Sequence, residues 1–346
     1  MSAAAGALAL AVLPGALRLV PDSRPLERAA PWNVETAQAV PVALTAAPVS
    51  DAVPIAPPPA ELTGELAPAV PPPALPFSGS RARGGVYALV VGIDDYPGSR
   101  SDLRSAVADA DTIDAALNGF GVPAANRVVL RNGQARKPAL VDAIRSLVSV
   151  AGPSSTVVLA YAGHVRKVDG DTEAIVAADG ALLPDDELAA LLAPAQAQRL
   201  WLLIASCYAG GFTEALGPGR ILTAAADARS LAYESRSING SYLVHHLVRE
   251  GWLEGRAGRS VQEAFAYAQA RMAEDGSEGR PVQMDYAGGP LVLGSGDPAA
   301  GRASSGAAAP APASEPPPQS QPPPPTTTTT TQPQRQCLAG LICQRG

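Results

Sequence analysis

Cysteine and histidine are scarce in this chain, which has three of each among its 346 residues. No group of them has the paired spacing of a zinc site, and no glycine-rich stretch has the spacing of a P-loop or a dinucleotide-binding loop. The sequence therefore predicts no cofactor and no resident metal. The short segment Asp169-Gly170-Asp171 falls far short of a calcium-binding loop and indicates a turn.

Charge and aromatic residues are also limited. Charged residues make up 17% of the chain, and the formal net charge is -6. Proteins that bind nucleic acid present a basic patch or stripe to the phosphates, and this composition offers none. We therefore expect no nucleic-acid partner. Aromatic residues account for only 4%, so valine, leucine, isoleucine and alanine must form the core.

Proline is sparse only in the middle of the chain. Ten of the 35 prolines lie in residues 79–300, and the other 25 lie in the flanking arms. This distribution predicts one globular domain over residues 79–300, between a Pro/Ala-rich linker (21–78) and a Pro/Thr-rich low-complexity linker (301–336). We expect the linkers to be extended, without helices or paired strands. The ends are residues 1–20 and a short cysteine-containing tail, residues 337–346.

The two ends of the chain bear on its location. Residues 1–17 carry no charge and match the apolar region of a signal peptide, but no basic segment precedes them; they form either a signal peptide or anchor, or an Ala-rich helix. Cys337 and Cys343 either close a small disulfide loop in an oxidising compartment or remain free thiols. These features favour an extracytoplasmic location, secreted or in the cell envelope, with the cytoplasm as the alternative. Any membrane contact would come from the N-terminal anchor.

Strand and helix patterns alternate through the central domain. Continuous apolar runs predict buried strands, and apolar residues at a spacing of three and four predict helices. Alternation with right-handed crossovers predicts an α/β fold, with a mostly parallel sheet flanked by helices on both faces. The predicted strands are 86–93, 127–131, 156–162, 173–178, 199–205 and 221–225, and the predicted helices are 103–120, 138–150, 185–192, 240–249 and 260–272.

One histidine and one cysteine follow two of the predicted strands. Ligands of such sheets bind beyond the carboxyl ends of the strands, and His164 and Cys207 lie just past those ends. Neighbouring strands are about 5 Å apart, so the two side chains can face each other, as nucleophilic acyl transfer by a thiol requires. The alternative is that Cys207 is a small buried hydrophobic residue. His245 and His246 lie within a helical pattern and are expected to be hydrogen-bonded or solvent-facing.

Five blocks in order resemble the caspase-like cysteine peptidases of the C14 type, closest to their bacterial and metacaspase-like branch. The resemblance spans about residues 84–294 and implies a single caspase-like domain. It also implies a cysteine endopeptidase that hydrolyses a protein or peptide substrate through an acyl-enzyme thioester. The blocks are YALVVGIDDYP, LRSAVADADTIDAAL, VVLAYAGH, the stretch from Asp179 through LLPDDEL, and LLIASCYAGGF.

The resemblance assigns roles to individual residues. It implies that Cys207 is the nucleophile and that His164 is the general base and acid. The backbone N–H groups of Cys207 and Val165 would bind the oxyanion, with Val165 standing where the family usually has glycine. Substrate binding would involve Asp109 and Ala205: a carboxylate at each position would hold a basic residue before the scissile bond, but the second position here is Ala205.

Departures from the family pattern leave an alternative function open. Ala162 replaces a common polar residue, and Asp185 or Asp186 would either compensate for the missing pocket carboxylate or form the solvated start of a helix. Together with Val165 and Ala205, these departures are compatible with a catalytically impaired interaction or scaffold module displayed on a stalk.

Self-cleavage in the arms is a further hypothesis. It rests on the arginines just before the domain, Arg81 and Arg83.

Overall fold

The computed structural model describes residues 51–55, 57–58, 62, 64–66, 68–73, 77, 84–277 and 279–304. The predicted signal peptide or anchor, residues 305–336 of the Pro/Thr-rich linker, the cysteine tail and the arginines before the domain lie outside these residues. The expectations about them therefore stay predictions. The first residues of the Pro/Thr-rich linker, expected to be extended, instead end the 3₁₀ segment Pro298–Ser304. Within the described residues, no helix combines the length and hydrophobicity that crossing a membrane would take.

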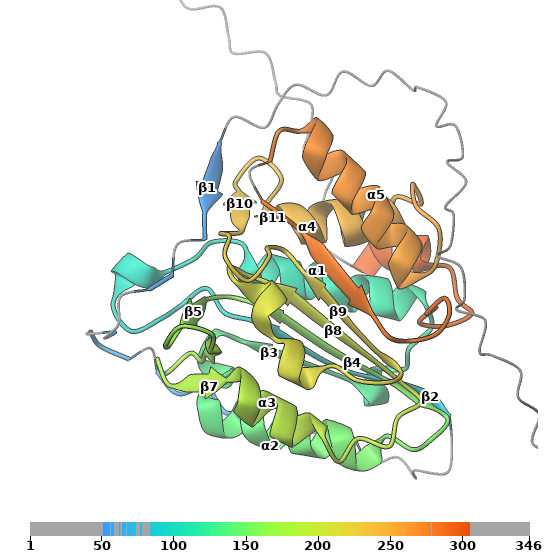
Figure 1. Cartoon of the computed structure of the whole chain (residues 1–346), viewed down its shortest axis with the longest axis horizontal. Coiled ribbons are helices and arrows are strands. Elements are labelled where there is room, and N and C mark those ends of the chain that lie inside the picture. Colours follow the sequence, from blue (N-terminus) through green and yellow to red (C-terminus); the bar gives the residue numbers. More distant parts are fainter. Residues whose placement is uncertain are drawn as a thin grey trace, which may run out of the picture. The chain divides into compact units, whose positions relative to one another are not determined.

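A six-stranded sheet lies at the centre of the domain (Figure 1). Five of its strands are parallel, and the edge strand β12 is antiparallel to β9. This arrangement confirms the predicted α/β class. In spatial order the strands are β12 (Val282–Asp285), β9 (Arg220–Ala224), β8 (Arg199–Ala205), β4 (Ser155–Ala162), β2 (Gly85–Gly92) and β3 (Arg127–Arg131).

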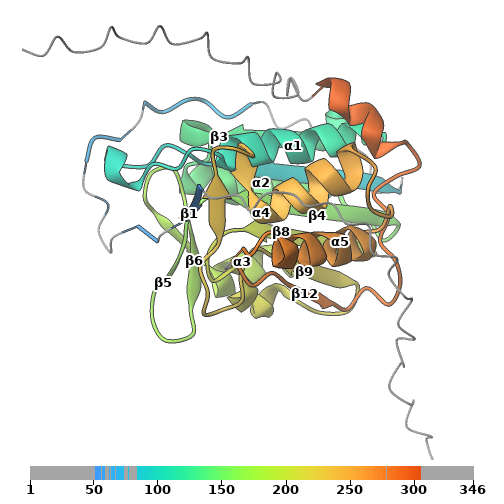
Figure 2. The ribbon, with the colours of Figure 1, turned by 90° about the horizontal axis from the view of Figure 1, so that it is seen from above.

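Helices cover both faces of this sheet. One face carries α1 (Ala106–Gly119), α4 (Tyr242–Val244) and α5 (Val261–Glu274), which lie side by side in Figure 2. The other face carries α2 (Lys137–Val150) and α3 (Asp185–Leu192).

Side chains of the central strands alternate between the two layers, as the pleat requires. In β4, Val158 and Ala160 join the apolar cluster around α1, while Val157 and Leu159 join the cluster around α2. Both strand faces are therefore apolar, which explains the unbroken hydrophobic runs of the sequence.

Two small three-stranded sheets lie beside the central one. The first contains β5 (Val165–Lys167), β6 (Glu173–Val176) and β7 (Leu182–Pro184), and the second contains β1 (Ala52–Pro54), β10 (Tyr233–Ser235) and β11 (Gly240–Ser241). Six short 3₁₀ segments complete the described elements: Ser99–Ser101, Ala124–Asn126, Asn132–Gln134, Ala209–Gly211, Thr213–Ala215 and Pro298–Ser304.

Strand β1 corrects the expectation that residues 21–78 contain no paired strand. It pairs antiparallel with β10, although Pro54 is one of its three residues. Ile55, the residue after β1, donates its N–H to the carbonyl oxygen of Ala232 at 2.8 Å. Because alternate N–H groups of an edge strand point toward the partner, the position of Pro54 is one whose N–H would point away. Proline therefore costs this ladder no hydrogen bond.

Two helices have a boundary more than two residues from the expected one. Helix α1 begins at Ala106 rather than 103, because the carboxylate of Asp94 accepts the N–H groups of Ala106 and Val107 at 2.8 and 3.3 Å. The predicted helix 240–249 begins only after β11 and continues as a π-helix, His245–Leu253. In a π-helix each backbone hydrogen bond spans five residues rather than four, so a turn holds more residues than in an α-helix. The spacing of apolar residues by three and four in the sequence does not reveal this difference.

Candidate active site

The predicted histidine and cysteine lie at adjacent ends of two paired strands. Ala162 and Ala205 are partners in the last register of β4 and β8, and His164 and Cys207 each come two residues later. The two loops are tied together, because the hydroxyl of Ser206 donates a hydrogen bond to the carbonyl oxygen of Gly163 at 2.6 Å. The sheet therefore places both residues just past neighbouring strand ends, and their joint action in catalysis stays a prediction.

The residue before the histidine must be glycine. Gly163 has a φ of 156°, and a Cβ there would lie 2.5 Å from the hydroxyl oxygen of Tyr161 and 2.6 Å from that of Tyr96. No side chain fits so close to both phenols. The close approach lets these hydroxyls reach the backbone of the next residue.

Two tyrosines hold the backbone of His164. Tyr96 accepts the N–H of His164 at 2.8 Å, and the hydroxyl of Tyr161 donates to its carbonyl oxygen at 2.7 Å. The Tyr96 ring also contacts the imidazole, with ring centroids 4.7 Å apart. Both tyrosines are buried, so the histidine loop is fixed by groups that are themselves immobilised by packing.

The imidazole of His164 has a defined tautomer. Its Nε2 lies 2.7 Å from the carbonyl oxygen of Ser101, and a carbonyl only accepts, so Nε2 carries the proton. Burial lowers the pKa of His164 to about 4, against the opposing effect of the Ser101 hydrogen bond. The ring is therefore neutral at pH 7. Its Nδ1 keeps a lone pair and has no hydrogen-bond partner although it is buried.

The thiol of Cys207 is fully buried. It donates a hydrogen bond to the carbonyl oxygen of Ile55 at 2.6 Å and accepts the N–H of Ala232 at 3.2 Å. Burial raises the pKa of Cys207 to about 11. Because Nε2 of His164 is bonded to Ser101 and Nδ1 has no partner, the cysteine and histidine share no hydrogen bond in this structure.

The residue after the cysteine has an unusual backbone. Tyr208 has φ 55° and ψ 9°, a left-handed conformation that few residues other than glycine adopt. Its N–H is bonded to the carbonyl oxygen of Ser230 at 3.0 Å, which helps to hold this turn. Such outliers concentrate at functional sites, where the surrounding structure enforces them.

Val165 begins strand β5 and is not among the described residues with positive φ. The conformational demand at this loop falls on Gly163 instead, so valine is tolerated here. One residue before Val165, the carbonyl oxygen of His164 accepts the N–H of Val176 on β6 at 2.9 Å. Alternate residues of an antiparallel pair bond to the partner, so the Val165 N–H points away from β6.

Asp109 lies in the first turn of α1 and is 2% exposed. Both of its carboxylate oxygens accept the N–H of Ser241, each at 3.1 Å. Burial and the nearby carboxylates of Glu234 and Asp94 raise its pKa well above the usual value. Ala205 lies in the same buried apolar cluster as Ile55 and Cys207.

The two aspartates at the start of α3 have local partners. Asp185 is buried and accepts the N–H of Glu173 at 3.0 Å, and Asp186 lies exposed in the first helical turn, where it accepts the N–H of Glu187 at 2.6 Å. Acidic groups at this end also favour the helix dipole. Asp186 matches the interpretation as a solvated helix start, whereas Asp185 also begins α3 but is buried.

Several residues of the site were not predicted from the sequence. Ser101 contributes a backbone oxygen, which leaves no side-chain signature. Ile55 and its neighbours lie about 150 residues before Cys207 in a segment whose composition is that of a linker. The one available signal was Tyr96, which follows the first buried strand closely, as a site residue of this fold class would.

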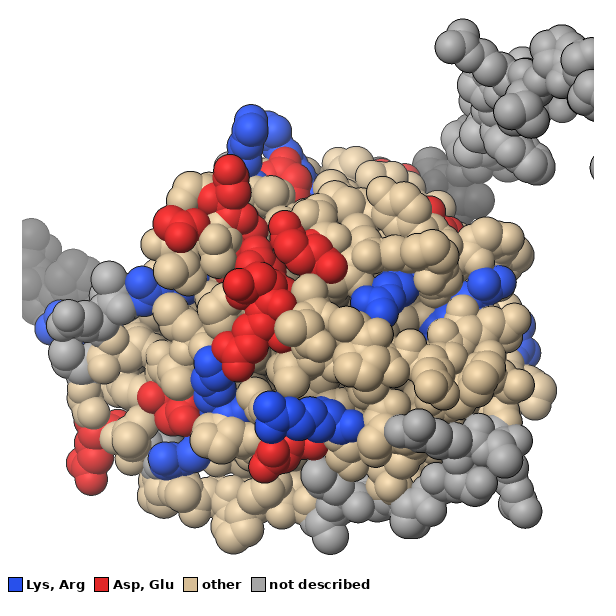
Figure 3. All heavy atoms as spheres, turned by 60° about the horizontal axis from the view of Figure 1, so that its bottom comes forward, with Lys and Arg blue, Asp and Glu red and all other residues tan. Residues whose placement is uncertain are grey.

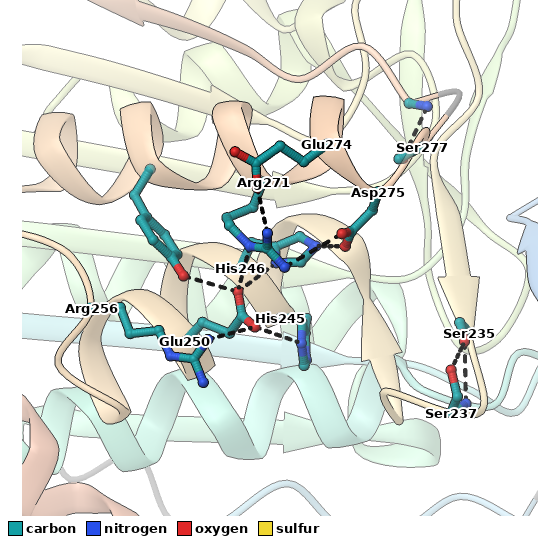
Figure 4. Close-up of polar contacts among 12 residues, drawn as sticks. Ser235, Ser237, His245, His246, Glu250, Arg256, Arg271, Glu274, Asp275 and Ser277 are labelled. Carbon is teal, nitrogen blue, oxygen red and sulfur yellow. Dashed lines mark hydrogen bonds and ion pairs between the residues drawn. The ribbon is translucent and has the colours of Figure 1, made fainter. Parts of the chain in front are cut away.

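The described residues contain one group that resembles a metal site, made of His245, His246 and Glu250, with ligand atoms within 4.8 Å of one another (Figure 4). Protein groups already occupy these atoms. His246 Nδ1 lies 2.8 Å from Glu250 and its Nε2 lies 2.9 Å from Asp275, while Arg271 Nε lies 3.4 Å from Glu250. Burial acts to raise the pKa of Glu250, but the two histidines outweigh it and lower the pKa. The cluster joins the π-helix to α5.

The charged surface is mixed in sign. On the face that Figure 3 shows, basic side chains lie among acidic ones rather than in a continuous stripe. The expectation that the chain has no nucleic-acid partner stays a prediction.

Comparison with known proteins gives one family. The family model described as the caspase domain (Peptidase C14) matches residues 86–288. A crystal structure of a protein from Geobacter sulfurreducens is similar with 19% identity and a TM-score of 0.48, over 58% of this chain and 92% of that chain. A search of curated proteins gives no match.

Proposed function

Because the chain belongs to the caspase-domain family of peptidases over more than half of its length, we propose that it is a cysteine endopeptidase with Cys207 as the nucleophile and His164 as the general base. The observation that carries the proposal is the lone pair on His164 Nδ1. It is buried and unpartnered, and it belongs to a ring whose other nitrogen is bonded to Ser101. A fixed neutral imidazole beside a thiol is the arrangement that proton removal needs.

The reaction follows from these positions. Nδ1 of His164 takes the thiol proton as the sulfur of Cys207 attacks the peptide carbonyl carbon. The C–N bond then breaks, the imidazolium returns the proton to the leaving amine, and the acyl group remains as a thioester on Cys207. Water attacks the thioester with His164 as base, which releases the carboxylic acid and restores the thiol. Ser101 stabilises the imidazolium because its carbonyl oxygen stays bonded to Nε2.

Backbone N–H groups would stabilise the negative oxygen that forms during each attack. The register turns the Val165 N–H away from β6, and the turn at Tyr208 presents the backbone beside Cys207. Fixed donors of this kind typically contribute about 3 kcal/mol each to the transition state. Valine serves as well as glycine here, because only its N–H takes part.

The proposal does not include a basic residue before the scissile bond. The resemblance implied one through Asp109, but both carboxylate oxygens of Asp109 accept the Ser241 N–H. Ala205 adds no charge, and burial raises the pKa of Asp109.

The test is hydrolysis of a library of peptidyl substrates by the full chain. Because Ile55 contacts the thiol, the assay also includes Asp51→Ala, which loosens the Ile55 segment. We expect cleavage that Cys207→Ala abolishes and that the matched control Cys343→Ala leaves unchanged. Cleavage that survives Cys207→Ala, or none by any form of the chain, would refute the proposal. The second result would favour the scaffold alternative.

A further inference from the structure

The chain covers its own candidate nucleophile with residues 51–55. Strand β1 pairs antiparallel with β10 in the register Ala52↔Ser235, Val53↔Glu234 and Pro54↔Tyr233. One residue further on, Ile55 donates its N–H to Ala232 at 2.8 Å, and its carbonyl oxygen meets the Cys207 thiol at 2.6 Å. The segment therefore ends with a carbonyl group directly on the sulfur.

The segment occupies the strand position that a peptide substrate would take. Peptidases commonly hold substrates as an added strand, with main-chain hydrogen bonds for affinity and pockets for alternate side chains. The residue whose carbonyl meets the nucleophile supplies the acyl group, and here it is Ile55. The strand to which a substrate would add is β10, and β1 already occupies it.

Anchors at both ends hold the segment in this position. Ile55 is 3% exposed and packs into the apolar cluster that includes Cys207 and Ala205. At the other end, the carboxylate of Asp51 accepts hydrogen bonds from the Ser235 hydroxyl at 2.5 Å and from the N–H and hydroxyl of Ser237 at 3.0 and 2.9 Å. The middle of the strand contributes less, since the Val53 side chain is 54% exposed.

The contact at the sulfur is not a reactive one. The thiol donates its proton to the carbonyl oxygen of Ile55, whereas attack requires the sulfur to face the carbonyl carbon and the oxygen to face backbone donors. The proton that His164 would remove is held by the segment itself. The Ile55 carbonyl therefore blocks the thiol and is not presented for cleavage.

We propose that residues 51–55 are an internal pseudosubstrate, which closes the peptide-binding strand position at β10 and must leave before a substrate can enter. This inference rests on the proposed peptidase function for its consequence, because an exchange of one strand for another regulates only a site that takes peptides. Closure of Cys207 can nevertheless be measured without any peptide hydrolysis.

The register provides a sharp pair of variants. The N–H groups of Val53 and Ile55 face β10, while that of Ala52 faces away. Val53→Pro therefore removes a ladder hydrogen bond at a position whose side chain is exposed. Ala52→Pro is the matched control, because it places proline at the preceding position without the loss of a ladder hydrogen bond. Asp51→Ala releases the segment from its other anchor and serves as a second variant, so that the test does not depend on one substitution.

The measurement is the rate at which iodoacetamide alkylates Cys207 in the full chain, quantified by peptide mapping. The protein is first treated with a reductant that is then removed, so that Cys343 is a free thiol and serves as the internal control for the reagent. We expect Val53→Pro and Asp51→Ala to raise the rate about tenfold by increasing the open fraction, while Ala52→Pro stays close to wild type. Excess synthetic peptide with the sequence of residues 51–55 should slow alkylation of Val53→Pro again. Equal rates in all four proteins, or equal acceleration by Ala52→Pro and Val53→Pro, would overturn the inference.

Parallel peptide hydrolysis assays separate this inference from the proposed function. Faster alkylation of Val53→Pro without peptide hydrolysis supports the closure of Cys207 by residues 51–55 and contradicts the proposed peptidase function. Peptide hydrolysis by wild type at the same rate as by Val53→Pro supports the proposed peptidase function and overturns the closure of Cys207 by residues 51–55.

Discussion

The thiol of Cys207 donates a hydrogen bond to the carbonyl oxygen of Ile55, which lies 152 residues earlier in the chain. The contact joins the Pro/Ala-rich arm to the end of strand β8. It also means that the resting protein has a neutral thiol beside a neutral imidazole, since burial raises the pKa of Cys207 to about 11 and lowers that of His164 to about 4.

Cys207 should react slowly with alkylating reagents at neutral pH. Only the thiolate is nucleophilic, so the rate should rise about tenfold for each pH unit. For wild-type protein the rise should continue toward pH 11, the approximate pKa of the buried thiol, rather than level off at the unperturbed value of 9.0. The pH profile of iodoacetamide alkylation, read at Cys207, measures this. A plateau near pH 9 would contradict it.

His164 should make the fold sensitive to acid. Its pKa is lowered from 6.5 to about 4 by burial, so below pH 6.5 the unfolded chain binds a proton that the folded chain does not. The free energy of unfolding is unaffected above pH 6.5 and should fall by ~3 kcal/mol as the pH drops to 4. Urea unfolding of wild type and His164→Gln at pH 7.5 and 4 isolates this contribution. The same pH dependence in both proteins would refute it.

The opened site should prefer an aliphatic residue before the scissile bond. Ile55 fills that position in the structure, in an apolar cluster with Ala205, and a basic side chain there would lose hydration. In Val53→Pro protein, a fluorogenic Ala-Val-Pro-Ile peptide should have a kcat/KM at least about tenfold above that of Ala-Val-Pro-Arg. A preference for arginine would instead support the basic pocket at Asp109.

The histidine cluster on the π-helix should be important for stability. His246→Ala removes the buried imidazole that joins Glu250 to Asp275 and leaves Arg271 as their shared partner, and breaking such a network costs about 3 kcal/mol. His245→Ala should cost less than about 1 kcal/mol, because its Nε2 lies 3.7 Å from Glu250 in a more exposed position. Urea unfolding of both variants gives the comparison. Equal losses would show that His246 does not hold the cluster together.

Much of the fold could be predicted because its signals are local. The buried runs ending at Ala162 and Ala205 were visible as strands, and their pairing explains why His164 and Cys207 follow neighbouring strand ends. The π-helix was missed because its first residues keep an ordinary helical spacing. Glycine at position 163 was visible in the sequence, but the reason for it, two phenol oxygens within 2.6 Å of where a Cβ would lie, depends on the distant Tyr96 as well as on the nearby Tyr161.

The rest of the site depends on backbone atoms and distant pairing. Ser101 acts through its carbonyl oxygen, which every residue has, so its sequence position carries no signal. Strand β1 has only three residues, one of them Pro54. It pairs with β10, which lies far along the chain, so no local pattern marks it as a strand. Asp109 was predicted to hold a basic substrate residue, and the Ser241 N–H that its carboxylate accepts could not be placed without the turn before α4. The role of Asp109 in substrate binding stays a prediction.

Covalent labelling by an Ala-Val-Pro-Ile fluoromethyl ketone tests the central claim most directly, because the probe must enter at β10 and react with Cys207. We predict that the full-length Val53→Pro protein is labelled at Cys207 alone, about tenfold faster than wild type. Adding His164→Ala to Val53→Pro should slow labelling about 100-fold, since the base is lost. Labelling at another residue, or a rate at Cys207 that neither Val53→Pro nor His164→Ala changes, would contradict the account.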